Sequence, residues 1–146
     1  MYKYEATDVG FHEENDALTV AFGGLPDADG HATIYLMFQR STDEGEDESG
    51  VEGVYAEWCG QGMSCYGCIS SVDLHPESIR VTFTEDAGFY APKDVEDAWN
   101  EVKLTELLVT FTLGGKKFKD LTEKLSFIFK GCDCYSVRGV DASTSA

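Results

Sequence analysis

The segment Thr33-Ile34-Tyr35-Leu36-Met37-Phe38-Gln39-Arg40 decides the fold that the sequence predicts. In an extended strand, its isoleucine, leucine and phenylalanine share one face, and its tyrosine, methionine and glutamine share the other. Because both faces carry apolar side chains, we expect a central strand that is covered on two sides. Two polar residues, glutamine and arginine, end the strand.

Similar alternation predicts further strands on both sides of this segment. Two strands precede it, joined by the polar turn at residues 12–16, and a glycine-rich and aspartate-rich loop over residues 23–30 leads into it. Later strands are predicted from the same period of two. The predicted strands are residues 2–8, 17–22, 33–40, 54–58, 65–69 with 70–74, 79–83 and 106–113, and a short last one is expected within residues 134–137.

One helix is predicted, over residues 116–130. Its apolar residues recur at spacings of three and four, which gives one apolar stripe, and Gly131 follows as a plausible cap. A helical turn is also expected at residues 94–100. The sequence therefore predicts one α+β domain over residues 1–139, mostly an antiparallel meander of about seven strands with the amphipathic helix packed on a face. Residues 140–146 are expected to be a disordered tail.

The charge of the chain is strongly negative, with a formal net charge of −16 over 146 residues. Between Arg40 and Arg80 there is no Lys or Arg, whereas nine Asp or Glu residues occur there. Such a field repels nucleic acid and attracts cationic partners, although colloidal stability alone would also explain it. With neither a long apolar run nor a signal peptide, the sequence predicts a cytoplasmic protein without a membrane segment.

Five cysteines raise the question of metal binding. An odd number without an export signal indicates reduced thiols rather than a disulfide framework. Cys59, Cys65 and Cys68 lie within ten residues, and the spacing Cys65-x-x-Cys68 fits half of a structural zinc site. Small buried thiols are the favoured interpretation, and zinc is the alternative. A Cys–His pair is formally possible with His12, His31 or His75, but all three fall in predicted loops, where solvated histidines normally occur. The segment before the predicted helix lacks the spacing of a phosphate-binding loop, so we expect no catalytic residue and no cofactor.

The polar residues after residue 40 follow a recognisable order. An acidic segment leads to Tyr55-Ala56-Glu57, then to a single Gln61, then to Tyr66-Gly67-Cys68-Ile69. This order resembles the bacterial Imm10-type immunity proteins of polymorphic toxin systems, which carry a Tyr-Leu-x-x-Gln-Arg strand, a Tyr-x-Glu, a Gln and a Tyr-Gly-Gly-Ile. The resemblance is most specific over residues 35–83. It departs at Cys65 and at Cys68, where the family usually has a second glycine.

The resemblance implies a binding protein rather than an enzyme. Its partner would be a cognate toxin domain, neutralised in a stoichiometric complex, and a basic nuclease cleft would accept carboxylates in place of phosphates. The oligomeric state stays open. The alternative is a cysteine-based zinc-binding module, or a small acidic protein-binding module unrelated to toxin immunity. The residues expected to contact the toxin are Asp43, Glu44, Asp47, Glu48, Glu52, Tyr55 and Tyr66.

A second group of polar residues is expected to form a network beside that surface. It comprises Gln39, Arg40, Glu57 and Gln61, all on or next to adjacent predicted strands. If those strands pair, Arg40 and Glu57 would form a charge-assisted hydrogen-bonded pair. Two interpretations remain open: the network sets the strand register, or it belongs to a recognition surface anchored by Tyr55 and Tyr66.

Overall fold

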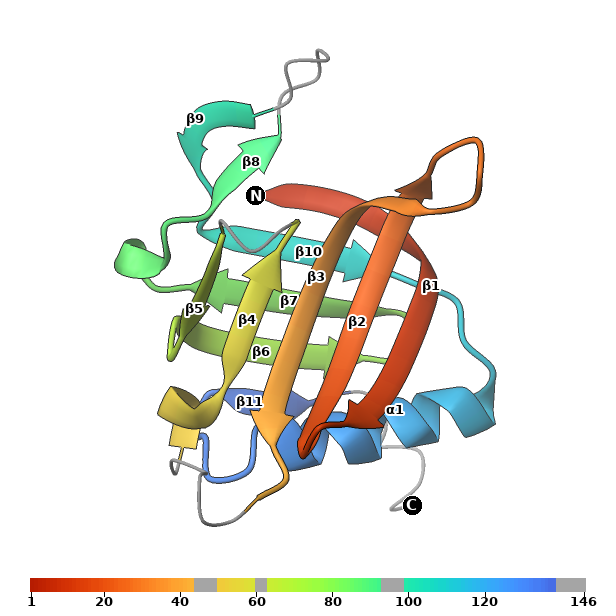
Figure 1. Cartoon of the computed structure of the whole chain (residues 1–146), viewed down its shortest axis with the longest axis vertical. Coiled ribbons are helices and arrows are strands. Elements are labelled where there is room, and N and C mark those ends of the chain that lie inside the picture. The colour runs from red at the N-terminus through yellow and green to blue at the C-terminus, as the bar shows by residue number, and fades with distance from the viewer. Residues whose placement is uncertain (44–49, 60–62, 93–98, 139–146) are drawn as a thin grey trace.

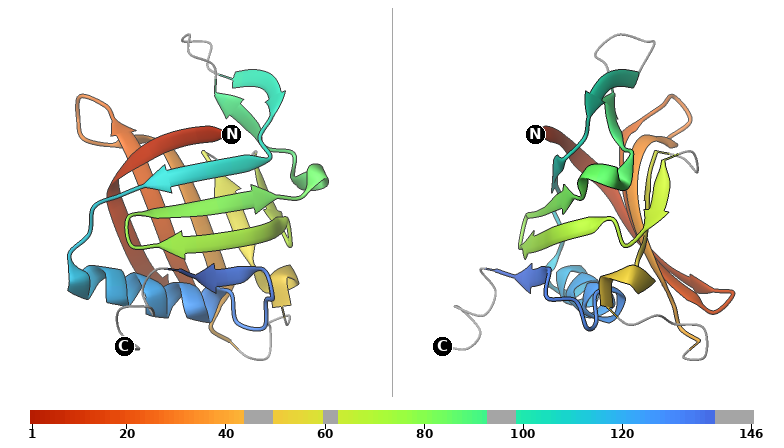
Figure 2. Two further views of the ribbon diagram at one scale, coloured as in Figure 1. Left: turned by 180° about the vertical axis from the view of Figure 1, so that it is seen from behind. Right: turned by 90° about the vertical axis from the view of Figure 1, so that its left-hand side faces the viewer.

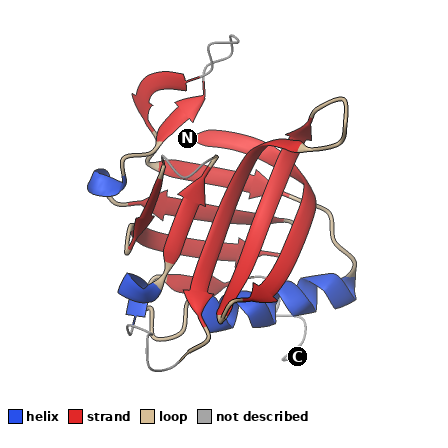
Figure 3. Cartoon of the chain, viewed as in Figure 1, coloured by secondary structure: helices blue, strands red, loops and turns tan. Residues whose placement is uncertain are grey.

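β-Strands make up most of the fold in the computed structural model, which describes residues 1–43, 50–59, 63–92 and 99–138 (Figure 1; Figure 3). Nine strands form one hydrogen-bonded sheet in the order β11-β6-β7-β10-β1-β2-β3-β4-β5, and β8 and β9 form a separate two-stranded sheet. Short 3₁₀ turns occupy Gly50–Gly53 and Glu85–Ala87. The strands and the helix are β1 (Tyr2–Glu14), β2 (Ala17–Pro26), β3 (Ala32–Ser41), β4 (Tyr55–Trp58), β5 (Ser64–Tyr66), β6 (Ile69–His75), β7 (Ser78–Phe83), β8 (Tyr90–Pro92), β9 (Trp99–Lys103), β10 (Glu106–Thr110), α1 (Gly115–Ile128) and β11 (Tyr135–Val137).

Strand β1 joins two layers because its two ends have different partners. The segment from Tyr2 to Glu5 pairs in parallel with β10, and the longer segment from Ala6 to Glu14 pairs antiparallel with β2. The register shifts between Ala6 and Asp8, and such an irregularity bends a strand. As a result, β1–β5 form one layer and β6, β7, β10 and β11 form the other, as the side view in Figure 2 shows.

The hydrophobic core lies between these layers, and α1 fills one end of it. Phe22 and Phe38 project inward from β2 and β3, and their ring centroids lie 6.4 Å apart. Phe129, which directly follows α1, packs edge-on against Phe38 at 5.1 Å. The helix buries Leu121, Leu125 and Ile128 and packs against β2 and β3, next to β11 (Figure 2). The predicted C-terminal helix is therefore confirmed.

The strand count and the pairing differ from the sequence prediction. The main sheet has nine strands rather than about seven, and two pairings, β1–β10 and β11–β6, are parallel. A parallel pairing joins segments that are distant in the chain, so the strand pattern of neither segment reveals it. The predicted helical turn lies mostly outside the described residues, and so does the predicted tail after residue 139.

The expected loop over residues 23–30 is wrong in its first half, because β2 continues to Pro26. A Cβ atom on Gly24 would lie 2.5 Å from the carbonyl oxygen of Glu5, so glycine is needed for the close approach of β1 and not for a turn. The expectation that β3 is covered on two sides is also wrong. In the views of Figure 2, no described element covers the outer face of the β1–β5 layer. Among the described residues, no helix is both long and apolar enough to cross a membrane.

Candidate functional site

The outer face of β3, β4 and β5 brings three of the singled-out residues into one row. Gln39 lies opposite Tyr55, and Tyr55 lies opposite Tyr66. The two tyrosine rings are in contact, with centroids 5.3 Å apart and planes inclined by 56°. The Tyr66 side chain at the edge of the sheet is 69% exposed. This row therefore presents an aromatic surface to solvent next to polar side chains.

Glu57 lies on the same face and is held by two tyrosines. The Tyr55 hydroxyl donates to Glu57 Oε1 at 2.6 Å, and the Tyr35 hydroxyl donates to Oε2. Burial raises the pKa of both phenols, and their hydrogen bonds to Glu57 raise it further. Only 7% of Glu57 is exposed. The sequence interpretation missed Tyr35, although its place in the alternation of residues 33–40 puts it on the same face as Gln39.

Arg40 points to the other side of the sheet, so the expected pairing of Arg40 with Glu57 is wrong. Strand alternation places Arg40 on the buried face with Phe38, whereas Glu57 faces outward opposite Met37. The guanidinium donates from Nη1 to the carbonyl oxygens of Ile128 at 2.8 Å and Lys130 at 3.2 Å. It therefore binds the carbonyl groups at the C-terminal end of α1.

Gln39 and Gln61 do not complete the expected network around Glu57 in the part of the chain that the structure describes. Gln39 donates from Nε2 to Thr19 Oγ1 at 2.9 Å, across the β2–β3 pair. Gln61 lies outside the described residues. The outward network is thus Tyr35, Glu57 and Tyr55, with Gln39 beside it.

A groove of about 570 Å³ opens beside the tyrosine pair. It lies where the β1–β2 turn, the end of β3 and the 3₁₀ turn Gly50–Gly53 meet β4 and β5 (Figure 1). Two carboxylate residues, Asp16 and Glu52, line it together with Tyr55 and Tyr66. Of the other acidic residues expected at the contact, Asp43 lies two residues after the end of β3, and Glu44, Asp47 and Glu48 are outside the described residues.

The cysteines do not have the arrangement that the sequence predicted. Cys65 and Cys68 form a disulfide across the tight turn between β5 and β6, where their Cα atoms are 6.1 Å apart. The expectation of reduced thiols is therefore wrong for this pair, and the remaining three cysteines are free. The Cys65-x-x-Cys68 spacing alone cannot distinguish a disulfide from a pair of zinc ligands. In this state, two of the three sulfurs considered for zinc are bonded to each other.

Cys59, the third sulfur considered for zinc, is held by backbone contacts. Its Sγ accepts a hydrogen bond from the Tyr35 backbone N–H at 3.5 Å. Burial raises the pKa of this thiol to about 11, which disfavours the thiolate form that binds zinc. The arrangement is that of a structural thiol.

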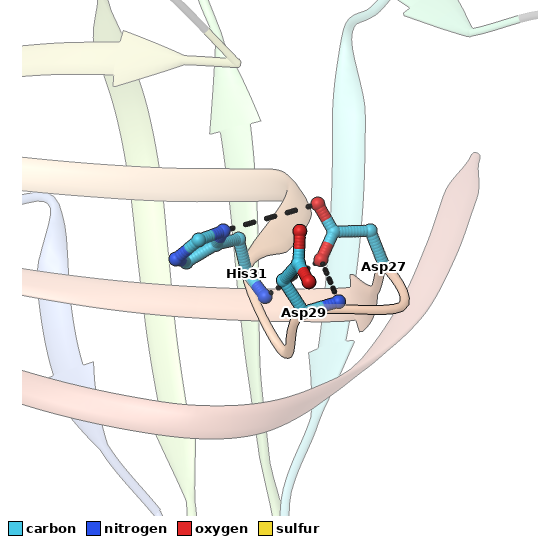
Figure 4. A group of neighbouring side chains, drawn as sticks. All are labelled: Asp27, Asp29 and His31. Atoms are coloured by element: carbon cyan, nitrogen blue, oxygen red, sulfur yellow. Dashed lines mark hydrogen bonds and ion pairs between the residues drawn. The ribbon is translucent and has the colours of Figure 1, made fainter.

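A different trio, Asp27, Asp29 and His31, has side-chain atoms close enough for a cation at the tip of the β2–β3 hairpin (Figure 4). All three residues are exposed. The Asp27 carboxylate already accepts the backbone N–H groups of Asp29 at 2.9 Å and His31 at 3.0 Å. These are the hydrogen bonds of an aspartate turn, which account for the geometry without a metal ion.

Comparison with known proteins identifies the family but no individual relative. Neither a curated protein nor a solved structure matches the chain. A family model described as Immunity protein 10 matches residues 5–91, which is more than half of the chain. The matched residues include the tyrosine row, the groove and the disulfide. The chain therefore belongs to the Immunity protein 10 family.

Proposed function

We propose that this protein is a non-enzymatic antitoxin that neutralises a cognate toxin domain by forming a stoichiometric complex with it. Membership in an immunity-protein family implies a toxin partner. The observation that carries the proposed binding surface is the exposed Tyr66 ring, which packs on Tyr55 beside a groove lined by Asp16 and Glu52. The protein would act in the cytoplasm, where a toxin with a nuclease activity would find its substrate.

The proposed surface has the composition expected of an interface. Tyrosine is enriched at the energetic centres of protein interfaces, because it buries a large ring at a low cost in side-chain entropy. Tyr66 is one of the few large hydrophobic residues with most of its side chain exposed among the described residues. A standard interface buries about 1,200–2,000 Å² in total, so the contact would extend from the groove over the outer sheet face.

Charge supports a basic partner surface. Asp16 and Glu52 line the groove, and the sequence from residue 43 to residue 52 carries further acidic side chains. Carboxylates gathered on one side accelerate encounter with a basic surface, and salt screens this effect. The basic phosphate-binding cleft of a nuclease is one such surface, and we propose it as the type of target.

Co-expression with the toxic domain encoded beside this gene tests the proposal. We expect rescue of growth and co-purification of the two chains in a fixed ratio. Tyr66→Ala should weaken the complex by about tenfold or more without lowering the melting temperature, because the side chain is mostly exposed. Tyr90→Ala is the matched control, since Tyr90 is a 40% exposed tyrosine on β8 that does not line the groove.

Charge-reversal variants distinguish the contribution of electrostatic steering from that of shape complementarity at the interface. Glu52→Lys should slow association and reduce its dependence on salt, whereas Asp29→Lys, at the opposite hairpin tip, should leave both nearly unchanged. Rescue without a detectable complex would contradict the proposal, as would neutralisation of many toxin molecules by one antitoxin molecule.

A further inference from the structure

Glu57 is a nearly buried carboxylate that forms no ion pair with a basic side chain in the described part of the chain. Its contacts are the hydroxyl groups of Tyr35 and Tyr55, and no lysine, arginine or histidine nitrogen of the described residues forms an ion pair with it. Arg40, on the adjacent strand, faces the opposite side of the sheet. Two neutral donors satisfy the oxygens but leave the negative charge uncompensated. A region of negative potential therefore remains on the outer face of β3 and β4.

The rings around this carboxylate suit a cation. A phenol that donates its proton toward a carboxylate carries more electron density on its ring, and the ring face attracts a cation more strongly. Tyr35 and Tyr55 are both polarised in this way by Glu57. Tyr66, in contact with Tyr55, extends the aromatic surface outward to solvent.

The backbone of Tyr66 is also fixed before any partner binds. It lies between Cys65 and Cys68, whose disulfide closes the turn, and Gly67 within the turn has a positive φ of 68°. Its strand position is set by pairing opposite Tyr55. A ring on a fixed backbone that already rests on a neighbouring ring loses less entropy when a ligand stacks on it.

We infer that Tyr35, Tyr55 and Tyr66 around Glu57 form a binding site for one arginine side chain on the surface of the toxin. The inference rests on the proposed function and names the chemical group that the site recognises. A guanidinium is planar and weakly hydrated, so it stacks on a tyrosine face more readily than an ammonium group does. The guanidinium stacks on the exposed ring of Tyr66 beside the half-buried rings of Tyr35 and Tyr55, where it interacts with the Glu57 carboxylate, while the groove carboxylates face neighbouring basic groups.

The test uses the free protein and a small probe, N-acetyl-arginine amide, followed by NMR of the tyrosine ring resonances. We expect saturable shifts at Tyr55 and Tyr66, and much smaller shifts with the neutral isostere N-acetyl-citrulline amide. Glu57→Gln keeps the shape of the side chain and should weaken arginine binding about tenfold, as expected when one partner of a close charge pair is neutralised. Glu13→Gln, an exposed carboxylate on β1, is the matched control and should have no effect.

A second variant covers the case in which Glu57→Gln lowers stability. Tyr66→Leu removes an exposed ring and should weaken arginine binding about three- to thirtyfold, the range of one cation–π contact. Equal binding of the arginine and citrulline probes would overturn the inference, and so would shifts that do not saturate.

Measurements with the toxin separate the inference from the function on which it rests. If the toxin binds and Glu57→Gln leaves its affinity unchanged, the arginine site is refuted and the proposed function stands. If the arginine probe binds as expected but no toxin complex forms, the site is supported and the toxin assignment is refuted. Reduced toxin affinity in Glu57→Gln, restricted to toxins that retain the contacting arginine, supports both.

Discussion

Replacement of Arg40 by methionine would test whether this residue belongs to the scaffold. The Arg40 side chain is 1% exposed, and its guanidinium donates hydrogen bonds to the carbonyl oxygens of Ile128 and Lys130. These oxygens lie at the C-terminal end of α1, where the helix itself supplies no donors. A positive charge there also interacts favourably with the helix dipole.

The size of the expected stability loss follows from the two carbonyl groups that would lose the Arg40 donor in Arg40→Met. A buried acceptor without a partner costs about 1–3 kcal/mol, and this cost applies to the Ile128 oxygen. The Lys130 oxygen is only partly buried and also accepts a hydrogen bond from Cys132 Sγ at 3.7 Å, so its loss of Arg40 costs less. Part of this loss of stability is offset, because burying a methionine does not require the desolvation of a charged guanidinium group. We therefore expect the free energy of unfolding to fall by about 1–3 kcal/mol, a large fraction of the roughly 5–15 kcal/mol typical of a domain.

Urea denaturation followed by tryptophan fluorescence measures this difference. Arg80→Met is the matched control: the Arg80 side chain is 48% exposed and lies 3.5 Å from Glu106, so its loss should cost less than about 1 kcal/mol. Arg40→Lys should fall between wild type and Arg40→Met, because lysine keeps the positive charge, but its shorter side chain does not bring its nitrogen to the position from which Arg40 Nη1 reaches both oxygens. Wild-type stability in Arg40→Met, together with a loss of toxin affinity, would refute the reasoning and make Arg40 a recognition residue.

Two further predictions concern the glycine in β2 and the disulfide. Gly24→Ala should lower the free energy of unfolding by about 2 kcal/mol, because the new Cβ would lie 2.5 Å from the Glu5 carbonyl oxygen. Gly10→Ala, with no atom within 4 Å of the new Cβ, should melt like wild type, and equal melting of both variants would argue against the close strand approach. Reduction of the Cys65–Cys68 disulfide, a sequence separation of 3, should cost about 2 kcal/mol from loop entropy. A urea midpoint that does not respond to dithiothreitol would contradict that value.

The candidate site was predictable from the sequence in part. The order of polar residues after residue 40 indicated the family, and a family model matching residues 5–91 confirms it. Tyr55, Tyr66 and Glu52 do meet at one groove. The partner of Glu57 was predicted wrongly as Arg40, although alternation already put Arg40 in phase with Phe38 and Tyr35 in phase with Gln39. The strand alternation therefore contained the correct assignment, but the expected attraction between the opposite charges of Arg40 and Glu57 favoured the wrong one.

The sequence by itself determined the local elements of this protein. The alternation of residues 33–40 and the three-and-four spacing of residues 116–130 identify β3 and α1, because side-chain periodicity is a property of a single segment. Only the tertiary structure decided how these elements meet. It pairs β1 with β10 in parallel, and it brings Arg40 to the carbonyl group of Ile128, 88 residues later. Contacts of this kind depend on packing across the whole core, which no periodicity within one strand or helix encodes.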